Sequence, residues 1–197
     1  MIGVLAVIAI LAALLIPKVF NAINDARINS AVVSADTVKT AVIDQYSKNG
    51  RFDATNQVAI PNFAAPWYGY DTNVLMVQQL LDKPFITKAG TNSVIQVRAC
   101  VAAGTAVDGV NAAYALDGNG GLSAGLNTAS GQYVVEAVIS GVSESDAQAI
   151  SQRIDGASMS TAGFNPGTAD FSGRVKYGTP AGGAGGATTV LIYLAHR

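Results

Sequence analysis

Residues 1–30 read MIGVLAVIAILAALLIPKVFNAINDARINS, and the first sixteen of them carry no charged or polar side chain. The first charge is Lys18, immediately after Pro17. As an α-helix, residues 1–16 are expected to be about 24 Å long, slightly short of a hydrocarbon core of about 30 Å. Such a segment favours transfer from water into lipid or into a bundle of other helices.

Three interpretations compete for this segment. A cleaved secretory signal should end in a small-residue site, but IPKVFNAIND, residues 16–25, offers no A-x-A pattern. A buried helix of a soluble core would need protein on every side, because the run is apolar around its whole circumference. We favour the third interpretation, a helix that lies in lipid at one stage and is buried between other chains at another.

The helix is predicted to continue from residue 21 to residue 49, where the sequence becomes amphipathic without a turn signal. Its apolar positions recur at spacings of three, four and eight, and are Ile23, Ala31, Ala35, Val38, Val42 and Tyr46. The polar face pairs Asp36 with Lys39 and Asp44 with Lys48, which supports a helix.

Gly50 is a suitable C-terminal stop for this helix. The whole helix is then about 75 Å long, so its first half is expected to protrude from a domain of this size. Pro17 removes one backbone hydrogen bond and clashes with the carbonyl of Ala13. We therefore expect a kink or a locally melted segment, with Ala9, Ala13 and Pro17 as its residues.

The residues VLAVIAILAALLIPKVFNAINDARINS, 4–30, resemble the N-terminal helix of the type IV pilins and pseudopilins. The resemblance covers residues 1–50. It implies an α+β, ladle-shaped subunit: a hydrophobic half-helix (1–20), an amphipathic half (21–50) packed on an antiparallel sheet, and a globular head (51–197).

The function implied by the resemblance is that of a major pilin, which polymerises through its N-terminal helix into a surface filament for adhesion, motility or DNA uptake. The implied partners are identical subunits, the inner membrane before assembly, a prepilin peptidase, and an assembly ATPase with its platform. The alternatives are a type II secretion pseudopilin forming a short periplasmic piston and, from a different class, a monomeric membrane-anchored binding module. The residues expected to pack in the filament core are Gly3, Leu5, Ile8, Ala9, Leu11, Leu14 and Ile16.

One departure concerns the glutamate that family members carry a few residues into the mature chain. By register on Pro17, this glutamate would immediately precede Met1. Either about five further native residues and a short basic leader ending in glycine precede Met1, or the chain is an atypical subunit. We favour the first alternative, because the further residues would also bring the apolar span to membrane length.

The globular half is predicted to hold a variable loop over residues 51–95 and an antiparallel sheet over residues 94–196. A helix-like patch is expected over residues 74–83. A short helix over residues 143–154 is predicted from the cap residue Ser143 and the acidic residues after it. The strand candidates, rich in β-branched and aromatic residues, are 94–102, 109–116, 132–140, 171–178 and 188–196.

Two features of the head invite a separate expectation. The aromatic residues Trp67, Tyr68 and Tyr70 suggest either packing on the long helix, which we favour, or an adhesive patch. The loop PAGGAGGA, residues 180–187, is predicted to be a mobile hairpin connection, because fixing glycine in one conformation costs more conformational entropy than fixing any other residue.

Catalytic and nucleic-acid functions find little support in the sequence. A G-x-S-x-G match at residues 121–125, with Asp155 or Asp170 and then His196 downstream, is flanked by loop-forming sequence rather than by a strand and a helix. The net charge of −1 provides no basic footprint for nucleic acid. We therefore expect a protein that is not an enzyme.

Cofactor binding is expected to be absent. The loop DGNGG, residues 117–121, partly imitates a calcium loop, so Asp117 and Asn119 are the only candidate metal ligands, and a plain turn is favoured. Cys100 is the single cysteine, which excludes an intramolecular disulfide, and it is interpreted as a small buried hydrophobic residue.

Overall fold

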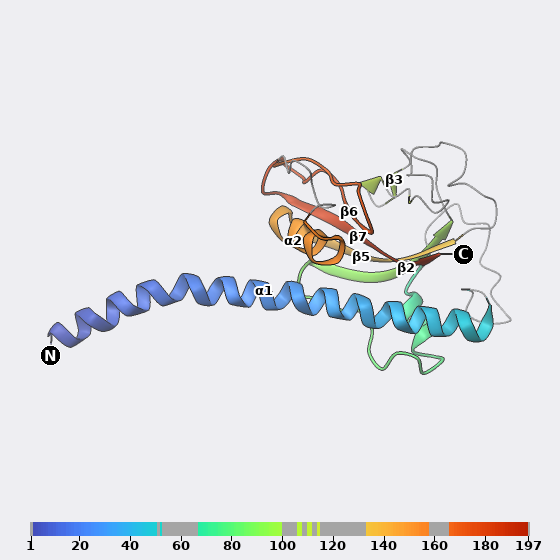
Figure 1. Cartoon of the computed structure of the whole chain (residues 1–197), viewed down its shortest axis with the longest axis horizontal. Coiled ribbons are helices and arrows are strands. Elements are labelled where there is room, and N and C mark those ends of the chain that lie inside the picture. Colours follow the sequence, from blue (N-terminus) through green and yellow to red (C-terminus); the bar gives the residue numbers. More distant parts are fainter. Residues whose placement is uncertain are drawn as a thin grey trace.

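The computed structural model describes residues 2–50, 52, 67–99, 106–107, 110–111, 114, 133–157 and 166–196. Over these residues the chain is α+β, with one long N-terminal helix and a five-stranded antiparallel sheet (Figure 1). The expected α+β class is confirmed over these residues. Cys100 and the loops at residues 117–121 and 121–125 lie outside the described residues.

The N-terminal helix, α1, spans Ile2–Asn49 without interruption. It ends at the expected glycine: Gly50 has a φ of 67°, and its N–H donates to the carbonyl of Tyr46 at 2.7 Å. This left-handed stop is one that a β-carbon would disfavour. The predicted pair of Asp44 and Lys48 forms on the exposed face, with 2.8 Å between Oδ2 and Nζ.

Pro17 lies inside α1, and the helix continues through it. The locally melted segment expected around Ala9, Ala13 and Pro17 is therefore absent from the single chain. Figure 1 shows instead that the N-terminal part of α1 is inclined to the remainder. A bend of this kind relieves the clash of the proline ring with the preceding turn while the neighbouring hydrogen bonds persist.

The main sheet has the strand order β1-β2-β5-β7-β6, and all neighbouring strands are antiparallel. Its strands are β1 (Trp67–Tyr68), β2 (Asn92–Ala99), β5 (Tyr133–Ser143), β6 (Val175–Tyr177) and β7 (Ala187–His196). In the middle of the sheet Ala137 of β5 lies opposite Ile95 of β2 and Ile192 of β7. Alternate residues of these strands therefore form two distinct faces.

One face of the sheet packs against the C-terminal half of α1 and against α2 (Glu144–Asp155), as Figure 1 shows. Ala31 and Ala35 of α1 are almost fully buried, and their small side chains permit close approach of the helix. Ile150 of α2 joins the same core as Ile95 and Ile192. The expected packing of residues 21–50 on the sheet holds from Ile28 onward.

The second helix follows its sequence signals closely. The Oγ of Ser143 accepts the N–H of Asp146 at 3.2 Å, which caps the N-terminus of α2. Gly156, with a φ of 84°, follows its end and donates to the carbonyl of Gln152 at 3.1 Å. The predicted helix over residues 143–154 is thus confirmed within a residue at each end.

The prediction that residues 109–116 form a strand of the main sheet is wrong. The described part of this segment contains only β4 (Val110–Asn111), which pairs with β3 (Ala106–Val107) in a separate two-stranded sheet. Val110 packs on Val138 and Leu191 from above the outer face of the main sheet. The apolar side chain thus covers the sheet instead of extending it.

Two other elements are shorter than expected. The helix expected over residues 74–83 is wrong for most of this range, since the helix found is a short π-helix, Asp71–Leu75. The buried carboxylate of Asp71 accepts the N–H of Phe85 at 2.8 Å, which ties the two ends of this segment together. The strand expected over residues 171–178 is reduced to β6. The start of β6 is held by Asp155, whose carboxylate accepts the N–H of Arg174, just before the strand, and the N–H of Val175, its first residue.

Tyr70 of the aromatic cluster packs on α1, as expected. Tyr70 is fully buried and donates its hydroxyl proton to Oε1 of Gln45 on α1 at 2.9 Å. Trp67 meets Tyr70 edge to face, with ring centroids 6.0 Å apart, and Tyr68 remains 46% exposed.

The expectation that the loop at residues 180–187 is a freely mobile connection is not supported. Glu144, the first residue of α2, is buried, and its carboxylate accepts the N–H of Gly185 at 2.6 Å and the N–H of Gly167 at 2.5 Å. The N–H of Glu144 in turn donates to the carbonyl of Gly186 at 3.1 Å. The loop conformation is therefore selected by contacts that no local property of the glycines predicts.

Candidate functional site: the projecting half of α1

The N-terminal half of α1 extends away from the head, as Figure 1 shows. Every residue from 10 to 23 is exposed, and the first buried residue of the helix is Ile28. Contacts of α1 with the sheet and with α2 therefore begin only where the amphipathic half begins. The projecting half has no apolar partner among the described residues.

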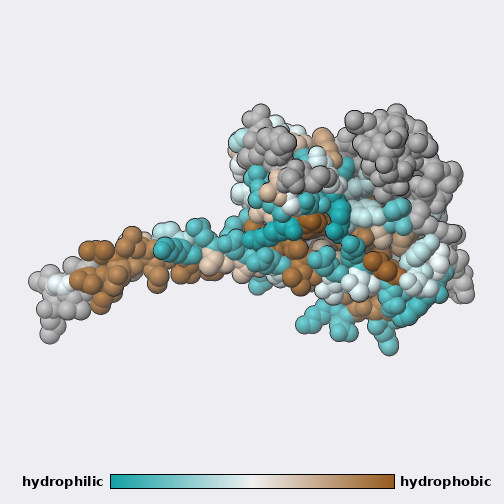
Figure 2. All heavy atoms as spheres, viewed as in Figure 1, coloured by the Kyte–Doolittle hydropathy of each residue, from teal (hydrophilic) through white to brown (hydrophobic). Residues whose placement is uncertain are grey.

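The projecting half exposes large apolar side chains around its whole circumference. Successive helical residues are rotated by about 100°, so the neighbours Leu14, Leu15 and Ile16, which are 55% to 67% exposed, face three different directions. Figure 2 shows a mainly hydrophobic surface over the described part of the projection, with hydrophilic atoms where the projection nears the head, whose own surface is mixed. The large apolar residues exposed on it are Val7, Ile8, Ile10, Leu11, Leu14, Leu15, Ile16, Val19, Phe20 and Ile23.

The predicted core-packing residues lie on this surface. Ile8, Leu11, Leu14 and Ile16 are each more than half exposed. Gly3 is exposed as well, and a β-carbon built there would meet nothing within 4 Å. The side chains of Leu5 and Ala9 lie outside the described set, although both residues belong to α1.

The structure extends the site beyond the residues predicted from sequence. Val19 and Phe20, which the prediction passed over, are 47% and 67% exposed. Ile23 was assigned to the buried face of the amphipathic half, but it is 53% exposed. Along the chain, α1 therefore meets the core five residues later than the spacing of its apolar residues predicts, and Ile28, which was not predicted, makes the first core contact. The absence of any acidic residue before Asp25 was the available signal for the longer surface.

A single charge, Lys18, interrupts the apolar surface between residues 2 and 24. Burial of half a Leu, Ile or Phe side chain contributes roughly 1 kcal/mol, so covering the ten exposed side chains would contribute on the order of 10 kcal/mol. The patch exceeds what a stable monomer in water usually exposes. The projecting half is therefore suited to contact with lipid or with other helices.

The sheet's outer face carries a charged cluster that we considered as an alternative site. The carboxylate of Glu136 accepts Nε and Nη2 of Arg98 at 2.5 and 2.9 Å, Nε2 of Gln96 at 2.6 Å and the hydroxyl of Tyr114 at 3.1 Å. Nζ of Lys176 lies 4.8 Å from the centroid of the Tyr114 ring. These groups contact one another, and each of the five residues is at most 7% exposed. The cluster therefore has the character of a structural ion pair.

Burial perturbs the titration of this cluster. It lowers the pKa of Lys176 to about 8, with the positive charge of Arg98 acting in the same direction. It raises the pKa of Tyr114, with the negative charge of Glu136 as the next cause. On the opposite face of the sheet burial raises the pKa of Tyr177 to about 12. The perturbed groups thus follow burial on both faces of the sheet.

The candidate hydrolase residues that the structure describes serve other roles. The carboxylate of Asp155 accepts the N–H groups of Arg174 and Val175, at 3.0 and 2.8 Å. Asp170 accepts the hydroxyl of Ser151 at 3.3 Å. His196 is exposed and contacts the hydroxyl of Tyr193.

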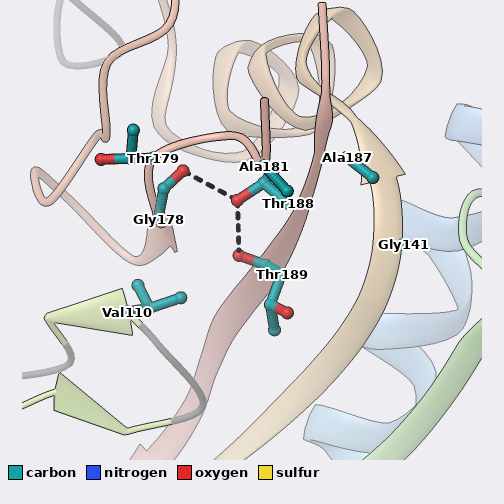
Figure 3. Close-up of a pocket in the computed structure, with 8 residues that line it drawn as sticks. All are labelled: Val110, Gly141, Gly178, Thr179, Ala181, Ala187, Thr188 and Thr189. Atoms are coloured by element: carbon teal, nitrogen blue, oxygen red, sulfur yellow. Dashed lines mark hydrogen bonds between the residues drawn. The ribbon is translucent and has the colours of Figure 1, made fainter. Parts of the chain in front are cut away.

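A cleft of about 250 Å³ lies beside the start of β7 (Figure 3). It is lined by small and hydroxylic residues, and the hydroxyl of Thr188 is already bonded to the carbonyl of Gly178 at 2.7 Å. No lining residue is charged, so the cleft provides no group for acid–base chemistry. Within the described ranges, no group of His, Cys, Asp and Glu is arranged to hold a metal, and Asp117 and Asn119 fall outside those ranges.

Among the residues described, no helix combines the length and the apolar character needed to cross a membrane. Comparisons of the chain with known protein families, with curated proteins and with solved structures give no match.

Proposed function

We propose that this chain is a structural subunit of a helical filament, assembled through the projecting half of α1, in the manner that the resemblance to type IV pilins implies. The observation that carries the proposal is the apolar surface around the whole circumference of the projecting half of α1, which finds no apolar partner among the residues that the structure describes. A one-sided stripe would suit a single partner helix or a membrane surface. An apolar surface on all sides suits the interior of a bundle in which each helix contacts several neighbours.

In the mechanism we propose, neighbouring helices replace lipid as the surroundings of the apolar half-helix. Before assembly, lipid of the inner membrane surrounds the apolar half-helix, and an ATP-driven assembly machine with its platform extracts the subunit after a prepilin peptidase has processed it. The half-helices of neighbouring subunits then replace lipid around it. Polymerisation follows because contact of the apolar surface with water is less favourable than contact with lipid or with other helices. Gly3 and the alanines between the large side chains permit close approach of neighbouring helices.

The proposed role is mechanical, needs no catalytic residue or cofactor, and places the assembled protein at the cell surface. The head keeps its own core behind Ile28, so assembly requires no rearrangement of the sheet. The globular half then coats the filament, while the half-helices form its axis. Two related architectures fit the same half-helix, a long external pilus and a short periplasmic pseudopilus.

The test compares charged substitutions on the projecting half with matched substitutions on the head. Leu11→Lys and Ile8→Asp should abolish filaments in electron micrographs, because a buried unpaired charge in the bundle costs several kcal/mol. Val77→Lys and Ile86→Asp are the controls, since these head residues are 66% and 70% exposed, comparable to the 61% and 56% of Leu11 and Ile8. Circular dichroism of each full chain in detergent verifies that the head remains folded.

Filaments formed by Leu11→Lys and Ile8→Asp at the wild-type yield would contradict the proposal. Fibres many micrometres long in the sheared fraction would identify a pilus, and short assemblies retained in the cell envelope would identify a pseudopilus. Crosslinking after mild detergent extraction that captured only monomers would instead favour the membrane-anchored binding module.

A further inference from the structure

The point at which α1 leaves the head is held by polar side chains of α2. Asp146 of α2 is 5% exposed, and its two carboxylate oxygens accept from two different residues of α1. Nδ2 of Asn24 donates to Oδ1 at 2.9 Å, and Nη2 of Arg27 donates to Oδ2 at 3.0 Å. Because residues three apart lie on the same side of a helix, one carboxylate spans a full turn of α1.

A second contact with the opposite polarity lies further along α2. Nη2 of Arg153 donates to Oδ1 of Asp25 at 2.9 Å, and Nη1 of Arg153 donates to the backbone carbonyl of Asp25 at 3.1 Å. Arg153 follows Asp146 by seven residues, two turns along α2, so both side chains lie on one face of that helix. The base of α2 thus meets an acid of α1, while the acid of α2 meets a base of α1.

The position of these contacts gives them their significance. Upstream of Asn24 every residue back to residue 10 is exposed, and the first buried apolar residue downstream is Ile28. The polar contacts therefore hold the last turn of α1 before the apolar projection. Without them the first anchored residue becomes Ile28, which lengthens the free arm by four residues, or about 6 Å.

The two contacts are expected to differ in strength. Arg153 and Asp25 have side chains 29% and 66% exposed, so solvent screens this pair. The side chain of Asp146 is 7% exposed, and it accepts two donors, one of them charged. The backbone N–H of Asp146 is also fixed by the cap at Ser143, so the carboxylate is presented from a rigid turn.

We propose that Asp146 and Arg153 are positioning residues that fix the direction in which the apolar half-helix leaves the head, and with it the relative placement of heads in the assembled filament. The inference about the filament rests on the proposed function, whereas the direction of the helix is a property of the single chain. In a bundle of half-helices, a small change in this direction displaces the heads and alters how they meet. A defined direction is therefore needed for one regular helical arrangement.

The direction is measured by electron paramagnetic resonance distances between two spin labels in the full chain in detergent. The labels are attached at Ala12→Cys on the projection and Lys88→Cys on the head, both exposed positions, in a Cys100→Ser background. Asp146→Ala should broaden and shift the distance distribution, and Arg153→Asp should broaden it less. The double variant Asp25→Arg/Arg153→Asp should restore the narrow distribution, because it re-forms the ion pair with exchanged charges.

The matched control is Asp44→Ala, which removes an exposed ion pair with Lys48 on the same helix and should leave the distribution unchanged. If Asp146→Ala unfolds the head, as judged by thermal unfolding, the Arg153 variant and its charge exchange carry the test. Unchanged distributions in folded Asp146→Ala and Arg153→Asp, or a charge exchange that fails to restore the distribution, would overturn the proposal.

Filament imaging then separates the two proposals. Asp146→Ala should give fewer filaments with a variable axial rise, and Asp44→Ala should give regular ones. Regular wild-type filaments from a chain whose label distances have broadened would overturn the link to assembly. Filament formation by Leu11→Lys would instead refute the filament proposal, while the distance measurement would still decide whether α2 sets the direction of α1.

Discussion

Glu144 and Gly185 are 41 residues apart, and the carboxylate Oε2 of Glu144 accepts the backbone N–H of Gly185 at 2.6 Å. The second oxygen accepts the N–H of Gly167, so one buried side chain holds two glycine turns against the start of α2. At Gly186 an added β-carbon would lie 2.0 Å from the carbonyl oxygen of Ala181, which shows how closely the loop folds on itself. The loop before β7 is thus held by a carboxylate.

Glu144→Gln should loosen both glycine turns. The amide nitrogen of glutamine cannot accept an N–H group, so one of the two backbone donors, which are only partly buried, loses its partner at a cost of about 1 kcal/mol. Hydrogen exchange should accelerate at Gly167 or Gly185, and the free energy of unfolding should fall by this amount. Asp82→Asn, at an exposed position, is the control. Exchange at both glycines unchanged in Glu144→Gln would refute the role of the carboxylate.

Arg98→Met should destabilise the head strongly. It leaves the fully buried carboxylate of Glu136 without its bidentate partner, which costs about 3 to 5 kcal/mol. The double variant Arg98→Met/Glu136→Leu should recover most of the loss, because neither charge then remains buried. Urea unfolding of the full chain in detergent measures both effects. A double variant no more stable than Arg98→Met would show that the loss comes from packing and not from the unpaired charge.

Lys176 should make the stability of the head rise with pH on the alkaline side of neutrality. Its pKa is about 8 in the folded chain against 10.5 for the free side chain, so between these values the unfolded state holds more protons. The free energy of unfolding therefore increases as the pH rises from 8 toward 10. Lys176→Met should remove this increase in urea unfolding measured just below pH 8 and just below pH 10. An equal increase in both proteins would exclude Lys176 as its source.

Pro17 should allow α1 to lose helix over residues 9–17 in the filament, although the single chain is helical there. Pro17 lacks the N–H that would bond to the carbonyl of Ala13, so this turn is the weakest of the projecting half. Axial packing of neighbouring half-helices can then be adjusted by extending the segment. A filament density map with an unbroken helix from residue 1 to residue 50 would contradict this prediction, and Pro17→Ala serves as the comparison with a restored donor.

The elements that local signals define were predictable. α2 has its cap at Ser143 and its closing glycine at Gly156, and both act through atoms within a few residues in the chain. α1 likewise ends at Gly50, because a left-handed residue stops a helix regardless of what surrounds it. The strands β2, β5 and β7 were found from β-branched residues, since long buried strands need them on both faces.

The predictions that were wrong depend on tertiary contacts and not on the local conformational preference of the residues. Ile23 and Ile28 are equally apolar, and the choice of which one contacts the core depends on where the sheet and α2 end beside α1. Val110 packs on Val138 and Leu191 at the outer face of the sheet. This contact joins residues that are distant in the chain, so local sequence does not predict it.

The apolar N-terminal half of α1 and its amphipathic continuation could be predicted from the amino-acid sequence, because the absence of charge and the period of hydrophobicity are properties of neighbouring residues. The point at which the apolar half leaves the head, the carboxylate that holds the glycine loop and the side chains of α2 that contact α1 became evident only in the folded chain. These features depend on hydrogen bonds between residues 41 to 128 positions apart, whose partners meet only after the apolar core has brought their backbones together.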